Sequence, residues 1–174
     1  MEKSASKCFT CGREAYFYSA YLKQNLCKKH FEKMLIRRVR SALISKGYKQ
    51  KAFRMTDDGS AAYRMLKFVF KKDDNGTVTL ENSVLEDFAL AVLEYFLAKK
   101  KPAHQIGLKT LFNPLYQVSE EELYAFLDMK GIKYKKRTHG GREGYLLDFM
   151  KDVEKRRPGG MLSAVKMGEK IGVI

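Results

Sequence analysis

Apolar residues recur every three or four positions along several stretches of this chain, and that spacing predicts amphipathic helices. The pattern Ser-x-x-Glu opens two of these stretches, at Ser83–Glu86 and Ser119–Glu122, and is typical of a helix capping box. Gly47 and Gly131 lie just past the ends of two helices, where glycine is common. The expected helices span 30–45, 61–70, 83–101, 119–131, 145–157 and 161–170.

The helical spacing also predicts which side chains face the core. The helix over 30–45 is expected to bury Phe31, Met34 or Leu35, Val39 and Leu43, with Arg37, Arg38 and Arg40 mainly on the opposite side. The helix after Ser83 is expected to bury Leu85, Phe88, Ala89, Val92, Leu93 and Phe96. The helix after Ser119 is expected to bury Leu123, Phe126 and Leu127.

Only short stretches suit β-strands. Ala52–Met55 reads as extended, and Thr77–Leu80 follows the strong turn signal Asp73–Gly76. The segment from Lys101 to Lys109 reads as a connector. Strands that alternate with helices predict an α/β layer with parallel strands, although few strands are evident.

Near the start of the chain, three cysteines and a histidine follow the pattern C-x2-C-x15-C-x2-H, formed by Cys8, Cys11, Cys27 and His30. A two-residue gap lets both members of a pair reach one ion from a tight turn, and four N or S ligands suit a closed, structural zinc site rather than a catalytic one. The alternative is three unrelated buried cysteines beside a surface histidine. Zinc is favoured because every cysteine of the chain falls in this window with paired spacing.

Composition narrows the class of protein. An apolar fraction of 45% supplies a real core, no apolar run is long enough to span a bilayer, and the N-terminus lacks the apolar stretch of a signal peptide. The length suits one domain with a small appendage, which we place at residues 48–174 and 1–47. With its cysteines assigned to a metal, the chain has none left for a disulfide, so we expect a cytoplasmic protein.

The net charge of +14 is unevenly distributed. Residues 1–54 hold 14 Lys and Arg against 3 Asp and Glu, residues 55–129 hold 8 against 12, and residues 130–157 hold 10 against 4. On a surface whose charges only contact solvent, positive and negative residues would be interspersed. The separation of charge along this chain therefore favours a polyanionic partner such as RNA. A membrane is the weaker interpretation, because no basic helix here carries a bulky apolar face free of core packing.

Two basic segments supply the candidate RNA contacts. The first offers Lys28, Lys29, Arg37, Arg38 and Arg40, and the second, a loop over 133–142, offers Lys135, Lys136, Arg137 and Arg142. Aromatic residues between the cysteine pairs suit base stacking, although packing around a small metal module explains most of them: Tyr16, Phe17, Tyr18 and Tyr21. His104 and His139 have no nearby nucleophile and read as surface residues.

The order of these segments resembles the N-type ATP-pyrophosphatase (PP-loop) family of tRNA 2-thiolation enzymes, in particular the archaeal and eukaryotic-type 2-thiouridine synthetases. The Cys/His pattern followed by an Arg-rich helix is similar to their N-terminal zinc module. Further similarities fall on Leu85–Leu93, Asn113–Tyr116, Ser119–Leu123, Lys130–Tyr134 and Glu154–Gly159. The resemblance implies that residues 1–47 form a zinc module with a basic helix, and residues 48–174 a reduced Rossmann-like, PP-loop-type α/β domain.

Departures from the family concern its chemistry. The family's ATP loop reads Ser-Gly-Gly-x-Asp-Ser, whereas this chain has Thr56–Ser60, with Asp57 and Asp58 where glycine and phosphate are expected. The aspartates are better explained by a turn beside a helix cap at Ser60 than by a cation site. Between Phe70 and Thr77 this chain has only a turn, where the family has further strands and helices that carry two cysteines. The third family cysteine would fall within 135–142, which contains none, and the family's C-terminal zinc module has no counterpart here.

We therefore expect a non-catalytic, zinc-containing protein that binds structured RNA, either tRNA or ribosomal RNA in a ribosome-associated role. One alternative is an active ATP-dependent tRNA 2-thiolation enzyme. Another is a protein–protein adaptor, regulatory subunit or homodimer.

Overall fold

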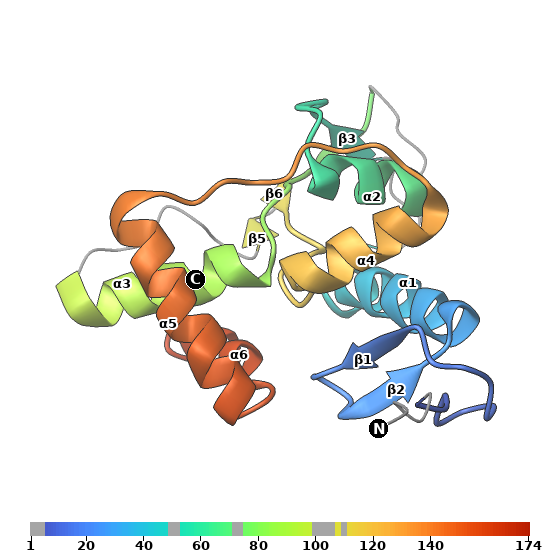
Figure 1. The fold of residues 1–174 in the computed structure, drawn as a ribbon. Helices are drawn as coiled ribbons and strands as arrows, with labels where there is room; N and C mark the ends of the chain where they lie inside the picture. Colours follow the sequence, from blue (N-terminus) through green and yellow to red (C-terminus); the bar gives the residue numbers. More distant parts are fainter. Residues whose placement is uncertain (1–5, 49–52, 71–74, 99–106, 109–110) are drawn as a thin grey trace.

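The structure is a computed structural model that describes residues 6–48, 53–70, 75–98, 107–108 and 111–174. Its elements follow one another along the chain as in Figure 1. They are β1 (Phe17–Ser19), β2 (Gln24–Leu26), α1 (Lys28–Ser45), β3 (Phe53–Met55), α2 (Ala61–Val69), β4 (Val78–Leu80), α3 (Leu85–Ala98), β5 (Gly107–Leu108), β6 (Leu111–Phe112), α4 (Glu120–Lys130), α5 (Gly141–Arg156) and α6 (Gly160–Lys170).

A small sheet lies at the centre of the fold, with strand order β3-β4-β6-β5. β3 pairs with β4 and β4 with β6 in parallel, whereas β5 and β6 are antiparallel. The register places Met55 opposite Leu80, and Leu80 opposite Phe112, so buried side chains lie in a row across the strands. The expected α/β class, Rossmann-like with few parallel strands and flanking helices, is confirmed.

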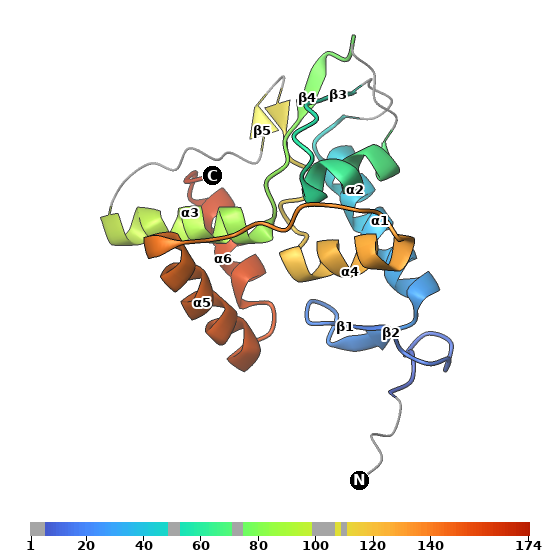
Figure 2. The same ribbon diagram turned by 45° about the horizontal axis from the view of Figure 1, so that its top comes forward.

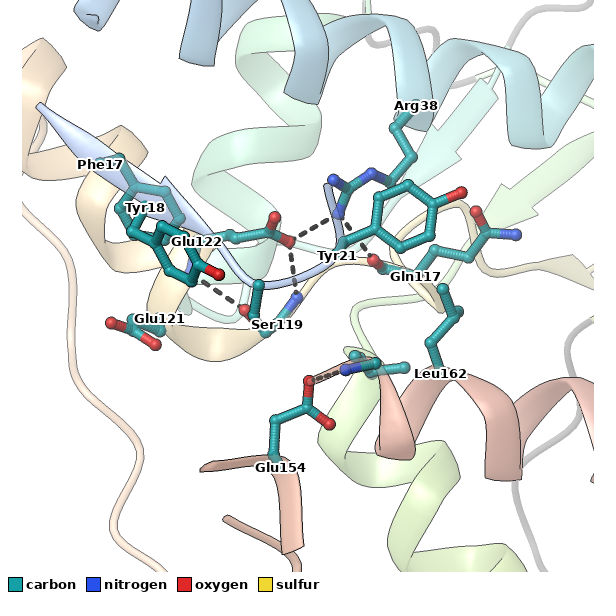
Figure 3. Close-up of a pocket in the computed structure, with 13 residues that line it drawn as sticks. Phe17, Tyr18, Tyr21, Arg38, Gln117, Ser119, Glu121, Glu122, Glu154 and Leu162 are labelled. Atoms are coloured by element: carbon teal, nitrogen blue, oxygen red, sulfur yellow. Dashed lines mark hydrogen bonds and ion pairs between the residues drawn. The ribbon is translucent and has the colours of Figure 1, made fainter. Parts of the chain in front are cut away.

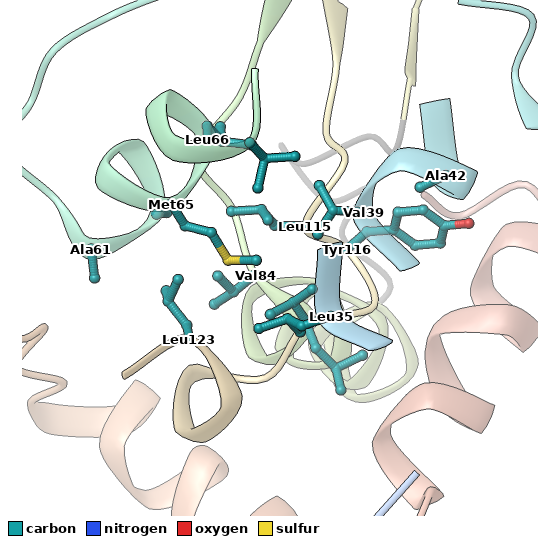
Figure 4. Packing of buried hydrophobic residues seen from close by; sticks show 14 of the residues in the cluster. Leu35, Val39, Ala42, Ala61, Met65, Leu66, Val84, Leu115, Tyr116 and Leu123 are labelled. Carbon is teal, nitrogen blue, oxygen red and sulfur yellow. The ribbon is translucent and has the colours of Figure 1, made fainter. Parts of the chain in front are cut away.

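The helices form two groups, which Figures 1 and 2 both show. α1, α2 and α4 pack together beside the β1–β2 hairpin, and α3, α5 and α6 form the second group. In the first group, Leu35 and Val39 of α1 meet Met65 and Leu66 of α2, and Leu123 of α4 closes the cluster (Figure 4). This core contains residues from both sides of residue 47, so the division into 1–47 and 48–174 stays a prediction about chain organisation.

The end of α3 corrects the expected buried stripe. Its first half is buried as predicted, but Phe96 is 44% exposed, and Leu97 is more exposed still. The last turn of α3 extends beyond the helices that cover it, α5 and α6 (Figure 2). A periodic pattern gives the direction in which a side chain points, but not the length of the partner that covers it.

The capping box expected at the start of α4 forms. At α4, the Ser119 hydroxyl accepts a hydrogen bond from the Glu122 N–H at 3.2 Å, and the Glu122 carboxylate accepts from the Ser119 N–H at 3.3 Å. At α3, the carboxylate that reaches back belongs to Asp87, which accepts from the Val84 N–H at 2.8 Å. The Glu86 carboxylate accepts a hydrogen bond from the Glu120 N–H, which joins the start of α3 to the start of α4.

Several short elements were not expected from the sequence. The β1–β2 hairpin lies where a loop was predicted, and β5 and β6 fall at and after the end of the expected connector. α5 begins at Gly141 rather than Tyr145, so the basic loop is shorter than its sequence suggested. In the described part of the chain, no helix is both long enough and apolar enough to cross a lipid bilayer.

Candidate metal centre and basic surfaces

The Cys/His pattern folds into a turn, a hairpin and the start of a helix. The Cys8 N–H donates to the Arg13 carbonyl at 2.7 Å, and the Gly12 N–H donates to the Cys8 carbonyl at 2.8 Å. Gly12 has φ +68°, a left-handed conformation that glycine adopts at little cost. At the other end, Cys27 is the N-cap residue of α1, and His30 lies in its first turn. The two turns bring both ligand pairs together.

The four ligand atoms lie close enough together to bind a single metal ion. All lie within 4.8 Å of one another. His30 Nδ1 is 3.5 Å from Cys8 Sγ and 3.4 Å from Cys27 Sγ, and the sulfurs of Cys11 and Cys27 are 3.7 Å apart. A tetrahedral zinc ion with Zn–S bonds of about 2.3 Å and Zn–N bonds of about 2.0 Å would place its ligands about 3.5–3.8 Å apart. The four residues therefore fit one metal ion.

The local backbone favours a metal-binding thiolate at Cys8. Burial opposes ionisation of this thiol, but hydrogen bonds from the backbone at Cys27, Thr10 and Cys11, with a smaller contribution from His30, lower its pKa to about 5. Metal ions bind cysteine as the thiolate. Cys8 is thus prepared to bind a metal at neutral pH.

Arg38 is not a solvent-facing arginine as the helical pattern suggested. Its guanidinium donates to Glu122 Oε2 at 2.7 Å and to the Gln117 carbonyl at 3.1 Å, with both charged side chains less than 10% exposed. The ring of Tyr21 covers the guanidinium at 4.6 Å (Figure 3). Arg38 therefore ties α1 to α4 and the hairpin, and it is not available for phosphate contact.

The other basic residues of the first segment remain on the surface. Lys28, Lys29, Arg37 and Arg40 are exposed, and the Lys28 ammonium lies 5.5 Å from the centroid of the Tyr16 ring. Within the part of the chain that the structure describes, no carboxylate lies within ion-pair distance of these four side chains. Lys46, Lys130 and Arg156, in contrast, each have a carboxylate partner.

The second basic segment crosses the top of the molecule, between α4 and α5 (Figure 1). Arg137 donates to both Asp87 oxygens at 2.7 Å, while Lys135, Lys136 and Arg142 are exposed. The backbone at Lys135 pairs with that at Ser60 in an isolated parallel bridge. The loop is therefore fastened to the ends of α2 and α3, and Arg137 is partly engaged in holding it there.

The loops that follow β3 and β4 meet at the carboxyl edge of the sheet, where ligands usually bind in such folds. Asp57 accepts a hydrogen bond from the Gly59 N–H at 3.0 Å, and Asp58 accepts from the Ser60 N–H at 2.9 Å and from the Asn82 amide at 3.0 Å. Partial burial opposes ionisation of Asp58, but the bonds from Ser60 and Asn82 lower its pKa. Ser60 Oγ caps α2, as predicted. The loop's own carboxylates thus hold two of its N–H groups.

A buried carboxyl cluster beside this edge was missed in the sequence. Both oxygens of Glu86 accept from the Glu120 N–H at 3.0 Å. Burial and the nearby acids Glu120 and Asp87 raise the pKa of Glu86 to about 8, against hydrogen bonds that favour ionisation.

His139, expected on the surface, has a side chain only 19% exposed and lies 2.9 Å from Glu120. His104 lies outside the described residues. The only feature of the sequence that could have indicated this cluster is the position of Glu86 next to the predicted buried face of α3.

In Figure 1, α4 lies between α1 and the segment that leads from α4 to α5. On one side, Tyr16 of the metal module donates to the Ala125 carbonyl at 2.8 Å. On the other, the Arg137 N–H donates to the Tyr124 hydroxyl at 3.2 Å, and Tyr134 stacks on Tyr124. Both parts of the chain are therefore held against neighbouring residues of α4, Tyr124 and Ala125.

Comparisons with known proteins identify a fold. No protein-family model matches the chain, and neither does any curated protein. Among solved structures, the U34-tRNA thiolase NcsA from Methanococcus maripaludis, with its [4Fe-4S] cluster, superposes with a TM-score of 0.81 at 16% sequence identity. The match covers 95% of this chain and 88% of the thiolase chain. At this identity the similarity concerns the fold alone. We had expected this chain to lack several strands and helices of the thiolation enzymes, and the 88% coverage of the thiolase chain does not support that expectation.

Proposed function

We propose that this protein is a non-catalytic, zinc-containing RNA-binding protein. The observation that carries the proposal is the group of exposed cations at Lys28, Lys29, Arg37 and Arg40, none of which is within ion-pair distance of a described carboxylate. Cations that serve only solubility are usually interspersed with acids, whereas a phosphate backbone needs them free. The zinc module supplies the rigid base from which they project.

Zinc is the metal that the donor geometry supports best. The ligands of a [4Fe–4S] cluster are bonded to four separate iron atoms, usually through four cysteines. Here three sulfurs and one imidazole converge at the spacing of a single ion. Zinc held by Cys8, Cys11, Cys27 and His30 would use every cysteine of the chain, which also favours a reducing, cytoplasmic location.

The absence of catalysis is inferred from the carboxyl edge of the sheet. A phosphate there would meet Asp57 and Asp58, whose charges oppose an anion, and would need the N–H groups that these carboxylates already hold. Once zinc has taken three thiolates, no cysteine remains for sulfur transfer. The alternative, an ATP-dependent tRNA 2-thiolation enzyme, would require the 56–60 loop to rearrange.

We place tRNA first among the structured RNAs, because one solved structure with this fold is that of a U34-tRNA thiolase. Ribosomal RNA is the second candidate. An RNA that contacts both basic segments would reach from Arg37 and Arg40 on α1 to Lys135, Lys136 and Arg142, which lie on the 133–142 loop and at the start of α5. Arg38 is excluded from this set by its buried ion pair.

Fluorescence anisotropy with labelled tRNA and a ribosomal RNA fragment, measured over a range of salt concentrations, tests the proposal. We expect the logarithm of the affinity to fall linearly with the logarithm of salt, and the Arg37→Glu/Arg40→Glu variant to reduce that slope by about 2. The matched control is Lys166→Glu/Lys170→Glu, which makes the same charge change on exposed positions of α6. Binding that is independent of salt, or equal losses in both variants, would contradict the proposal.

Titration of the zinc-loaded protein with Mg-ATP tests the enzymatic alternative. We expect no measurable binding heat. Micromolar affinity that Ser60→Ala abolishes would show a working nucleotide site and would favour the thiolation enzyme.

A further inference from the structure

A groove of about 510 Å³ lies between the β1–β2 hairpin and α1, and it reaches His30 of the candidate metal centre. The hairpin contributes Tyr21, Leu22 and Gln24, and α1 contributes Lys33, Met34, Arg37 and Arg38. Its volume falls within the range of about 300–1,000 Å³ that is typical of small-ligand sites. The groove is separate from the carboxyl edge of the sheet, where ligands bind in most proteins of this architecture.

The chemistry of the lining is amphipathic and cationic. Apolar surface comes from Leu22 and Met34, while Lys33 and Arg37 supply exposed positive charge. No aspartate or glutamate is among the described residues that form the groove. Such a lining suits a flat, partly apolar group that carries negative charge at one end.

Tyr21 is held in place before any ligand arrives. The Leu22 N–H donates to the hydroxyl of the buried Ser19 at 3.3 Å, which fixes the turn that carries Tyr21. The Tyr21 ring stacks on the Arg38 guanidinium at 4.6 Å, and Arg38 is itself fixed by Glu122 (Figure 3). Tyr21 nevertheless remains 45% exposed. A fixed, exposed aromatic ring loses little conformational entropy when a base stacks on it.

We infer that this groove binds one unstacked nucleobase of the RNA, with Tyr21 as the stacking platform and Lys33 and Arg37 on the adjoining phosphates. This inference rests on the proposed RNA-binding function and goes beyond it, because it predicts a preference for RNA with exposed bases. Structured RNAs present such bases in loops, bulges and single-stranded ends. Phosphate contact alone would not distinguish them from a duplex.

The experiment compares a short unstructured RNA strand with the blunt duplex that it forms with its complement, both binding to the zinc-loaded protein. Purely electrostatic binding favours the duplex, which has more phosphates at higher density. We expect the single strand to bind more tightly, and Tyr21→Leu to weaken single-strand binding by roughly 5- to 100-fold while changing duplex binding little. Tyr18→Leu is the matched control, since Tyr18 is 51% exposed in the same hairpin but does not line the groove.

The outcomes separate this inference from the proposed function. If neither RNA binds, both are wrong. If the duplex binds as well as the single strand, or if Tyr21→Leu and Tyr18→Leu behave alike, the RNA-binding function survives and the base site does not. If a polyglutamate peptide displaces the strand as efficiently as unlabelled RNA, the groove is a general polyanion surface and the base site is refuted. Tyr21→Phe, which keeps the ring, should retain the wild-type preference, and the wild-type comparison stands even if Tyr21→Leu is unstable.

Discussion

Replacing Arg38 by methionine is expected to destabilise the protein strongly, although α1 has two other arginines within three positions. The substitution keeps an unbranched side chain of similar length and removes the guanidinium. Glu122, whose side chain is 7% exposed, would then lose the partner that lies at 2.7 Å. The Gln117 carbonyl would lose a donor at 3.1 Å, and Tyr21 would lose the cation beneath its ring.

The size of this loss follows from the burial of the ion pair. Removing one partner of a buried ion pair typically costs about 3–5 kcal/mol, because the other charge is left buried and unpaired. We therefore expect the free energy of unfolding to fall by about 3–5 kcal/mol at pH 7.

Urea denaturation followed by circular dichroism, with zinc present throughout, measures this loss. Arg40→Met is the control on the same helix, because Arg40 is exposed and should change stability by less than about 0.5 kcal/mol. Adding Glu122→Gln to Arg38→Met should recover most of the stability, since the amide leaves no buried charge and still reaches the Ser119 N–H. Equal stability of the Arg38 and Arg40 variants, or no recovery in the double variant, would refute the buried ion pair.

Three further predictions follow from other contacts. Cys27→Ser should abolish stoichiometric zinc in metal analysis and lower the melting temperature, because a structural metal contributes to folding. Glu86→Gln should make stability depend less on pH. In the folded wild type, Glu86 keeps its proton up to its raised pKa of about 8, whereas the unfolded chain loses that proton near the ordinary pKa of 4.5. The stability of the wild type therefore decreases as the pH rises between these two values, and the variant lacks this contribution. Gly168→Ala should cost about 1–3 kcal/mol in urea denaturation, because a Cβ there would overlap Val92 of α3.

Each of these predictions has a clear negative result. Full zinc content in the Cys27 variant would mean that the metal lies elsewhere. Parallel pH–stability curves for Glu86→Gln and the wild type would mean that Glu86 is not protonated in the folded state at neutral pH. For Gly168, the matched control is Gly160→Ala, where a Cβ would make only ordinary contacts, and equal effects would argue against close packing of α3 and α6.

The sequence predicted those features that depend on local patterns. The ligand spacing of Cys8 and Cys11 is a property of one turn, and the structure brings these residues together with Cys27 and His30 as expected. The helix positions and the Ser119 capping box likewise follow from residues three or four positions apart. Short strands such as β5 were missed because two residues carry no periodicity that could be recognised.

The features that the sequence did not predict depend on contacts between distant elements. Arg38 occupies a polar position on α1 and was assigned to the solvent face, but Glu122, which is 84 residues away, makes it part of the interior. Glu86 matched a capping pattern, yet its carboxyl group is used by the backbone of Glu120. In both cases a local pattern gave the correct helix and the wrong partner for a charged side chain.

The central claim is that RNA is held by the exposed cations of the two basic segments. Ultraviolet crosslinking of the protein in the cells that produce it, followed by purification, RNA sequencing and mass spectrometry of the crosslinked peptides, tests this claim most directly. We predict enrichment of one class of structured RNA, with crosslinks in the hairpin and α1 and in the 133–142 loop. Recovery of no more RNA than with the Arg37→Glu/Arg40→Glu variant, or crosslinks confined to α5 and α6, would contradict it.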